Sequence, residues 1–131
     1  MGNKILRNIK GICFLMLILY GILIIDLFIP FSINAYGIVP RTKIGLIGIF
    51  TSPFLHGSLQ HLISNSIPLV IMLLILSVFY EKKWIPVLAI IVLIGGGLTW
   101  VFGANGNHIG ASGLIYGLAG FLISNGIIEK N

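Results

Sequence analysis

Between Trp84 and Ile128 the chain reads WIPVLAIIVLIGGGLTWVFGANGNHIGASGLIYGLAGFLISNGII, 45 residues without a single Lys, Arg, Asp or Glu. A helix needs about 20 apolar residues to cross a bilayer, so a run of this length must turn within itself. The polar, glycine-containing segment GANGN at 103–107 marks that turn. This run therefore predicts two membrane spans, near 84–102 and 112–128.

Charged residues divide the rest of the chain in the same way. Residues 44–80 form a second uncharged run, and residues 11–25 form a third, after which apolar residues resume beyond Asp26. We therefore expect two more spans, near 11–30 and 58–80. A cleaved signal peptide is the alternative for the first span, but its apolar segment is long and lacks a small-residue cleavage site.

The composition indicates a membrane protein of one domain, covering residues 1–131. Hydrophobic residues make up 57% of the chain and charged residues 8%, whereas soluble domains carry about 25% charged residues. The predicted fold class is an all-α, polytopic transmembrane helix bundle with four spans in contact with the lipid bilayer. Its net charge of +5 is scattered rather than gathered into a stripe, which excludes nucleic acid as a partner.

The distribution of Lys and Arg predicts the orientation. Six of these residues lie in the two tails and in the turn after the second span, and two lie in the loop at 31–57. The excess of positive charge marks the cytoplasmic side, so both termini are expected in the cytoplasm. The loop at 31–57 is then an outer loop. Its apolar residues predict packing on the bundle or the interface, and Gly45, Gly48 and Pro53 argue against a straight helix.

Two polar clusters stand at membrane depth, where polar residues are costly and usually functional. The first is HGSLQHLISN at 56–65, and the second is HIGASGLIYG at 108–117. With four alternating spans, both clusters lie at the same membrane face. We therefore expect them to meet.

Helical spacing predicts how the first cluster is arranged. His61 and Asn65 are four residues apart and share one helix face. Ser58 is the expected N-cap, and His56 is expected in the segment that leads into the helix. Taken singly, a His–Asn pair in a membrane is more often a hydrogen-bonded link between helices.

The second cluster places a serine at a helix start. Ser112 follows Gly110, and free backbone N–H groups gather at a helix N-terminus. A serine hydroxyl there, with His and Asn donors on a facing helix, suits acyl transfer. Gly113 and Gly117 form a G-x-x-x-G pair for close helix contact. Taken singly, Ser112 is more often a helix cap, and a general base is missing.

With these residues the chain resembles the rhomboid intramembrane serine proteases. The matching motifs are H-x₄-H-x₃-N at His56, His61 and Asn65, and G-x-S-G at 110–113. Tyr116 and the segment YGIVPR at 36–41 also match, the latter in the manner of short bacterial members.

The resemblance implies a role for each matched residue. Ser112 would be the nucleophile, and His61 and Asn65 would stabilise the oxyanion. His56 would tie the outer loop to the core, and Tyr116 would orient the catalytic base. Supporting positions on the backbone are Gly110 and Gly113.

The resemblance also implies which reaction the protein catalyses and in which membrane it is found. Substrates would be transmembrane proteins cut near the outer face, with no metal and no organic cofactor, in a bacterial cell membrane. Rhomboids have six core helices, with the catalytic histidine on the sixth. Since no histidine follows His108 in this sequence, the expectation is a C-terminally truncated, partial rhomboid fold that is inactive alone, because His108 is badly placed to act as the base.

Three hypotheses follow from these residues. The first is an intramembrane serine endopeptidase, truncated in this form. The second is a non-catalytic rhomboid-like protein that binds client transmembrane helices. The third is a purely structural or pore-forming membrane protein. A partial bundle would expose its fourth helix, so a homo-oligomer or a complementing membrane chain is expected.

Overall fold

The computed structural model describes residues 2–80 and 83–129 of the chain. This part is helical and confirms the predicted all-α class, with one isolated backbone bridge between Ile38 and His108. The elements are α1 (Gly2–Phe28), η1 (Ile33–Tyr36), α2 (Lys43–Thr51), η2 (Ser52–Phe54), α3 (Leu59–Phe79), α4 (Trp84–Phe102) and α5 (Ser112–Ile128), where η denotes a 3-10 turn.

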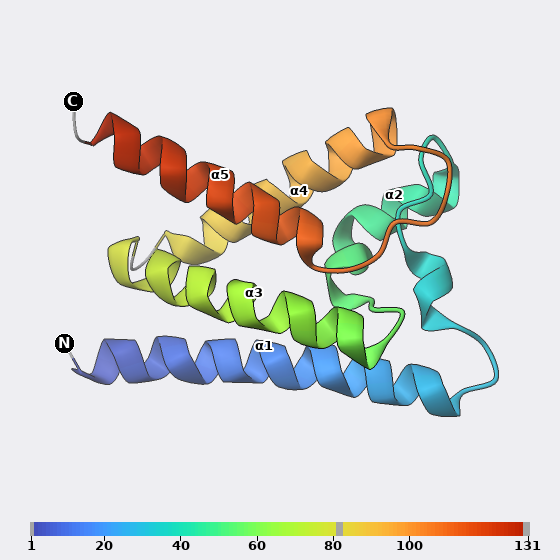
Figure 1. Cartoon of the computed structure of the whole chain (residues 1–131), viewed down its shortest axis with the longest axis horizontal. Helices are drawn as coiled ribbons and strands as arrows, with labels where there is room; N and C mark the ends of the chain where they lie inside the picture. Colours follow the sequence, from blue (N-terminus) through green and yellow to red (C-terminus); the bar gives the residue numbers. More distant parts are fainter. Residues whose placement is uncertain (1, 81–82, 130–131) are drawn as a thin grey trace.

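The helices form a bundle in which each long helix has defined neighbours. α3 lies between α1 and α5, and α4 crosses α5 and packs against it (Figure 1). α2 packs against α4 at the end of the bundle where α3 begins. This end gathers the loop at 31–57 and both polar clusters, which the sequence predicts to lie at the same end.

Among the residues that the structure describes, three helices are long and apolar enough to cross a membrane: Ile5–Phe28, Leu59–Phe79 and Trp84–Phe102. The fourth predicted span forms at its expected place, Ser112–Ile128, but is only 17 residues long, which is short for a span. The first helix begins well before residue 11, because Lys and Arg favour a helix and do not interrupt it. It ends at Phe28, before Pro30.

The sequence argues against a straight helix in the loop at 31–57, and the structure has three short helical elements there, of which α2 contains both Gly45 and Gly48. Thr42 caps α2 by accepting a hydrogen bond from the Gly45 N–H at 3.1 Å. Gly45 and Gly48 are both buried and lie against the backbone of Val39 and Gly37. Glycine is needed there because the two segments touch backbone to backbone, so these residues dock the helix rather than break it.

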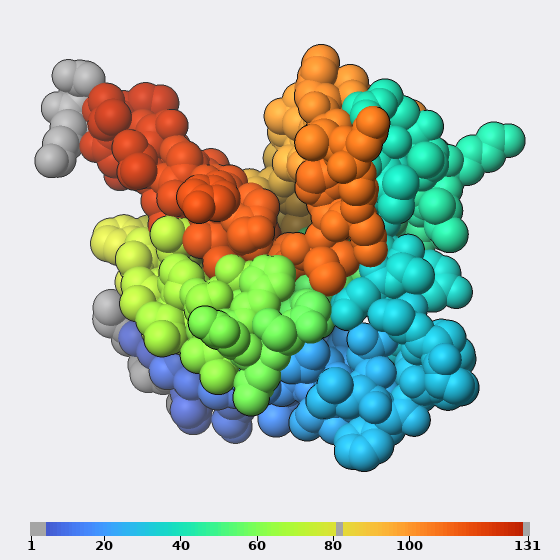
Figure 2. All heavy atoms as spheres, turned by 45° about the vertical axis from the view of Figure 1, so that its right-hand side comes forward, coloured from blue at the N-terminus to red at the C-terminus, as the bar shows by residue number. Residues whose placement is uncertain are grey.

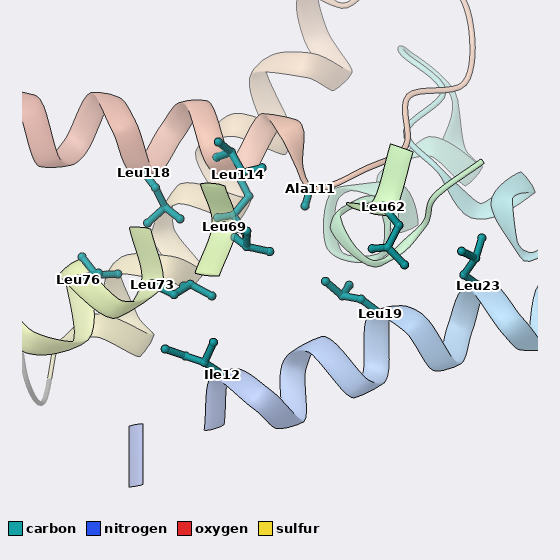
Figure 3. Packing of buried hydrophobic residues seen from close by; sticks show 11 residues of the cluster. Ile12, Leu19, Leu23, Leu62, Leu69, Leu73, Leu76, Ala111, Leu114 and Leu118 are labelled. Carbon is teal, nitrogen blue, oxygen red and sulfur yellow. The ribbon is translucent and has the colours of Figure 1, made fainter. Parts of the chain in front are cut away.

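The hydrophobic core lies between α1, α3 and α5 (Figure 3). Leu62, Leu69 and Leu76 of α3 recur every seven residues and are at most 1% exposed. They meet Leu19 of α1 and Leu118 of α5. In contrast, α4 has no buried residue. α3 is therefore the central helix, and it carries the first polar cluster at its start.

We predict that Gly45→Ala destabilises the protein by about 1–3 kcal/mol, because the added methyl group would overlap the Val39 carbonyl. Gly97→Ala in α4 is the matched control, since a methyl group there meets no atom within 4 Å. That control should be neutral or stabilising by up to about 1 kcal/mol. Unfolding in detergent measures both, and equal effects would contradict the docking role of Gly45.

Candidate active site

His56 lies at the centre of the polar end of the bundle. It precedes α3 and is only 2% exposed. Its Nε2 atom accepts a hydrogen bond from the Ala111 backbone N–H at 3.3 Å and lies 3.1 Å from Asn65 Nδ2. Because a backbone N–H can only donate, Nε2 is unprotonated and the neutral ring carries its hydrogen on Nδ1. This ring therefore links the loop before α3, α3 itself and the residue before Ser112.

His61 and Asn65 both lie against Gly110. A Cβ atom built on Gly110 would lie 2.7 Å from His61 Nε2 and 3.3 Å from Asn65 Nδ2. Gly110 has φ +109°, a conformation that glycine adopts without strain. Its N–H donates to the Ser52 carbonyl at 2.9 Å. The predicted shared face of His61 and Asn65 thus meets the backbone of the second cluster.

The start of α3 has the predicted cap. Ser58 accepts a hydrogen bond from the His61 N–H at 3.1 Å. The rings of His61 and His56 pack edge to face, with centroids 5.0 Å apart and an interplanar angle of 66°. The cap therefore fixes the backbone of His61, and the ring contact adds a second restraint on its side chain.

Ser112 is the first residue of α5, as predicted. Within the described part of the chain its hydroxyl makes no hydrogen bond. It lines a pocket of about 300 Å³ together with Asn107, His108 and Gly110. Figure 2 shows the molecule hollowed between α5 and the segment that follows α4. Gly110 borders both this pocket and the two side chains of α3, whereas His61 and Asn65 do not line the pocket.

The remaining predicted residues of the second cluster differ in their surroundings. His108 Nε2 lies 2.8 Å from the Ala104 carbonyl, and its backbone pairs with Ile38. Tyr116 is 78% exposed, and Gly113 faces open space. Gly117 lies against Ile91 of α4, so only this member of the G-x-x-x-G pair makes the close helix contact.

The sequence reasoning missed a polar link through Asn34. Asn34 Nδ2 donates to Asp26 Oδ2 at 3.0 Å and to the His56 carbonyl at 3.2 Å. Asn107 Nδ2 in turn donates to the Asn34 carbonyl at 2.6 Å. Asn34 thereby connects the end of α1, the approach to α3 and the loop before α5. The available signal was Asp26, an acidic residue inside an apolar run.

Burial and the adjacent His61 imidazole lower the pKa of His56 from 6.5 to about 4. The backbone of Phe54 acts in the opposite direction, although Nδ1 of His56 has no partner in hydrogen-bond geometry among the described residues. The neutral ring can accept from Ala111, whereas the charged ring cannot. Among the described residues, no group of three or more His, Cys, Asp or Glu side chains could hold a metal ion.

We predict that stability falls as the pH falls from 6.5 to about 4. Between these two pH values, His56 binds a proton in the unfolded chain but not in the folded chain. The contribution of His56 to the free energy of unfolding is therefore fully present above pH 6.5 and is lost toward pH 4. The expected loss is about 1–3 kcal/mol, measured by unfolding in detergent at a series of pH values. His56→Gln should flatten this slope and His108→Gln should keep it; an unchanged slope in His56→Gln would contradict the assignment.

We also predict that Gly110→Ala displaces the His61 ring, since the added methyl group would lie 2.7 Å from it. Gly106→Ala is the matched control, because Gly106 has a positive φ of 142° in the same loop but a methyl group there meets no atom within 4 Å. NMR shifts of the His61 ring should move in the first variant only. A similar movement in both would show that backbone strain alone is responsible.

The similarity of this chain to known proteins covers most of its length and is not limited to the two motifs. Uncharacterized proteins of Mycobacterium bovis and Mycobacterium tuberculosis are each 34% identical over 119 residues, which cover 86% of this chain and 50% of theirs. An uncharacterized protein of Mycobacterium leprae is 34% identical over 137 residues, covering 98% of this chain and 55% of its own. The chain thus spans about half the length of these curated relatives. No solved structure matches.

The family profile described as the rhomboid domain matches residues 43–131. This range is more than half of the chain and contains both polar clusters. The described helices include three that are long and apolar enough to span a bilayer. The chain is a membrane-embedded member of the rhomboid family.

Proposed function

We propose that these 131 residues provide the nucleophile and the oxyanion-binding groups of an intramembrane serine endopeptidase of the rhomboid type, with transmembrane proteins as substrates. The observation that carries this proposal is the convergence of His56, His61 and Asn65 on residues 110–111, directly before Ser112. A hydrogen-bonded link between two helices needs no such histidine pair. A serine beside a pocket, at a helix start that polar side chains hold in place, suits acyl transfer.

In the proposed reaction, Ser112 Oγ attacks the scissile carbonyl, and negative charge develops on the carbonyl oxygen. The Ala111 N–H is engaged by His56, so the backbone donors left at this helix start begin with the N–H of Ser112. His61 and the second amide hydrogen of Asn65 would complete the oxyanion site. The general base would take the Ser112 hydroxyl proton and give it to the departing amine as the C–N bond breaks, which leaves the acyl-enzyme. Water entering through the pocket would then hydrolyse the acyl-enzyme, releasing the acid and free Ser112.

The general base is the part that these residues do not supply. His108 borders the same pocket as Ser112, but its Nε2 lies 2.8 Å from the Ala104 carbonyl. No histidine follows it in the 131 residues. We propose that the base comes from polypeptide outside these residues or from a second membrane chain. The distribution of Lys and Arg supports cytoplasmic termini, with the site at the outer face. The similarity to mycobacterial proteins supports a bacterial membrane.

The alternative function is binding of client transmembrane helices without catalysis. The exposure of Tyr116 and the open space beside Gly113 favour it, because they leave one face of α5 available to another helix. The reactivity of Ser112 separates the two functions. A client-binding protein needs no reactive serine at this position.

We predict that the purified 131-residue chain does not measurably cut a transmembrane reporter, since serine proteases without their base retain little activity. The Ser112 hydroxyl should nevertheless react slowly with a small fluorophosphonate, and added imidazole should accelerate the reaction by acting as the base. Intact-protein mass spectrometry measures the labelling. His61→Ala or Asn65→Ala should slow it by ~10-fold or more.

Ser112→Ala should abolish the labelling, and Ser124→Ala, farther along the same helix, should leave it unchanged. No labelling of Ser112 with or without imidazole would contradict the catalytic proposal and favour client binding. A reporter cut that Ser112→Ala abolishes would instead show that these residues already contain a base.

A further inference from the structure

Arg41, between η1 and α2, holds the end of α4. Its Nη1 atom donates to the carbonyls of Val101 and Gly103, at 3.1 and 3.0 Å. Its Nη2 atom donates to Asn105 Oδ1 at 2.7 Å. The last carbonyls of a helix have no partner within the helix and carry its negative dipole end, so a cation is favourable there.

The backbone around Arg41 is joined to α4 as well. The Arg41 N–H donates to the Trp100 carbonyl at 3.0 Å, and Trp100 Nε1 donates to the Thr42 carbonyl at 2.8 Å. Arg41 has φ 60° and is the only residue other than glycine with a positive φ among the described residues. Such a conformation persists only where the surroundings determine it strongly, and these conformations cluster at functional sites.

The segment that Arg41 holds is one wall of the pocket beside Ser112. Residues 103–109 follow α4, and their last three members line the pocket. The far end of this segment is fixed by the backbone pairing of His108 with Ile38. Its near end is fixed by the Arg41 hydrogen bonds to Gly103 and Asn105, and the third bond holds Val101 of α4. A guanidinium group reaches several acceptors at once, which the single ammonium group of a lysine does not do equally well.

We infer that Arg41 is a positioning residue for the reaction at Ser112: it fixes residues 103–109 as the wall that limits access to the serine from the outer side. The relevance of this access to catalysis rests on the proposed function of Ser112 as the nucleophile. Arg41 ends the segment YGIVPR at 36–41, outside the two polar clusters, and its side chain binds no group that reacts. Its loss frees the wall and exposes position 112 to reagents in water.

The test uses the full chain with Cys13→Ala and Ser112→Cys, so that the only thiol lies at the pocket. A charged, membrane-impermeant thiol reagent then reports access to residue 112. Arg41→Gly, which keeps the positive φ available, should raise the labelling rate several-fold, and Arg41→Lys should raise it less. Millimolar methylguanidinium should return the rate of Arg41→Gly toward that of the parent.

Lys43→Ala is the matched control, an exposed cation two residues away with no side-chain partner in the described part of the chain. It should leave the rate unchanged. Equal rates for Arg41→Gly and Lys43→Ala, or no rescue by methylguanidinium, would overturn the inference. A rise matched by a thiol placed at Ser124 would indicate general loosening and would also overturn it. Thiol labelling requires no hydrolysis, so this result is independent of whether Ser112 proves reactive.

Discussion

The arrangement of this polar site depends on one buried hydrogen bond, from the Ala111 N–H to Nε2 of His56. A buried N–H without a partner is costly, and so is a buried imidazole. The Ala111 N–H and His56 Nε2 satisfy each other, and Asn65 Nδ2 lies 3.1 Å from the same nitrogen. Because this nitrogen must accept, the ring has to stay neutral, which its low pKa of about 4 ensures over the ordinary pH range. The start of α5 is thereby attached to the start of α3.

The loop at 31–57 holds the elements around this hydrogen bond in place. Asn34 joins Asp26 to the carbonyl of His56, and Arg41 holds the end of α4. Two glycines of α2 allow its backbone to lie directly on the preceding segment. In a bilayer the hydrophobic effect does not drive helices together, so such close contacts and hydrogen bonds have to determine the arrangement. This explains why so many polar side chains are concentrated at one end of an apolar chain.

The positions of the long helices could largely be predicted from the uncharged runs of the sequence, because an uncharged apolar run of about 20 residues indicates a membrane-spanning helix. The starts of α3 and α5 followed from Ser58 and from the turn before Ser112. The helix α2 could not be predicted, since Gly45 and Gly48 break a helix by local propensity and dock it only once Val39 and Gly37 lie alongside. For the same reason Gly113 and Gly117 look equivalent in sequence, although only Gly117 touches another helix. The acceptor role of His56 depends on a residue 55 positions away and has no local signature.

Several of the contacts that build this end of the molecule join residues far apart in the chain. Arg41 reaches residues 60 to 64 positions later, and Asn107 reaches back 73 positions to Asn34. Contacts of such separation form late, because the intervening chain must first be ordered. A nascent chain that has emerged only as far as α3 therefore already holds the loop at 31–57, but it lacks the acceptors that Arg41 binds and it lacks Asn107. The order of synthesis thus delays assembly of this polar site until α5 has left the ribosome.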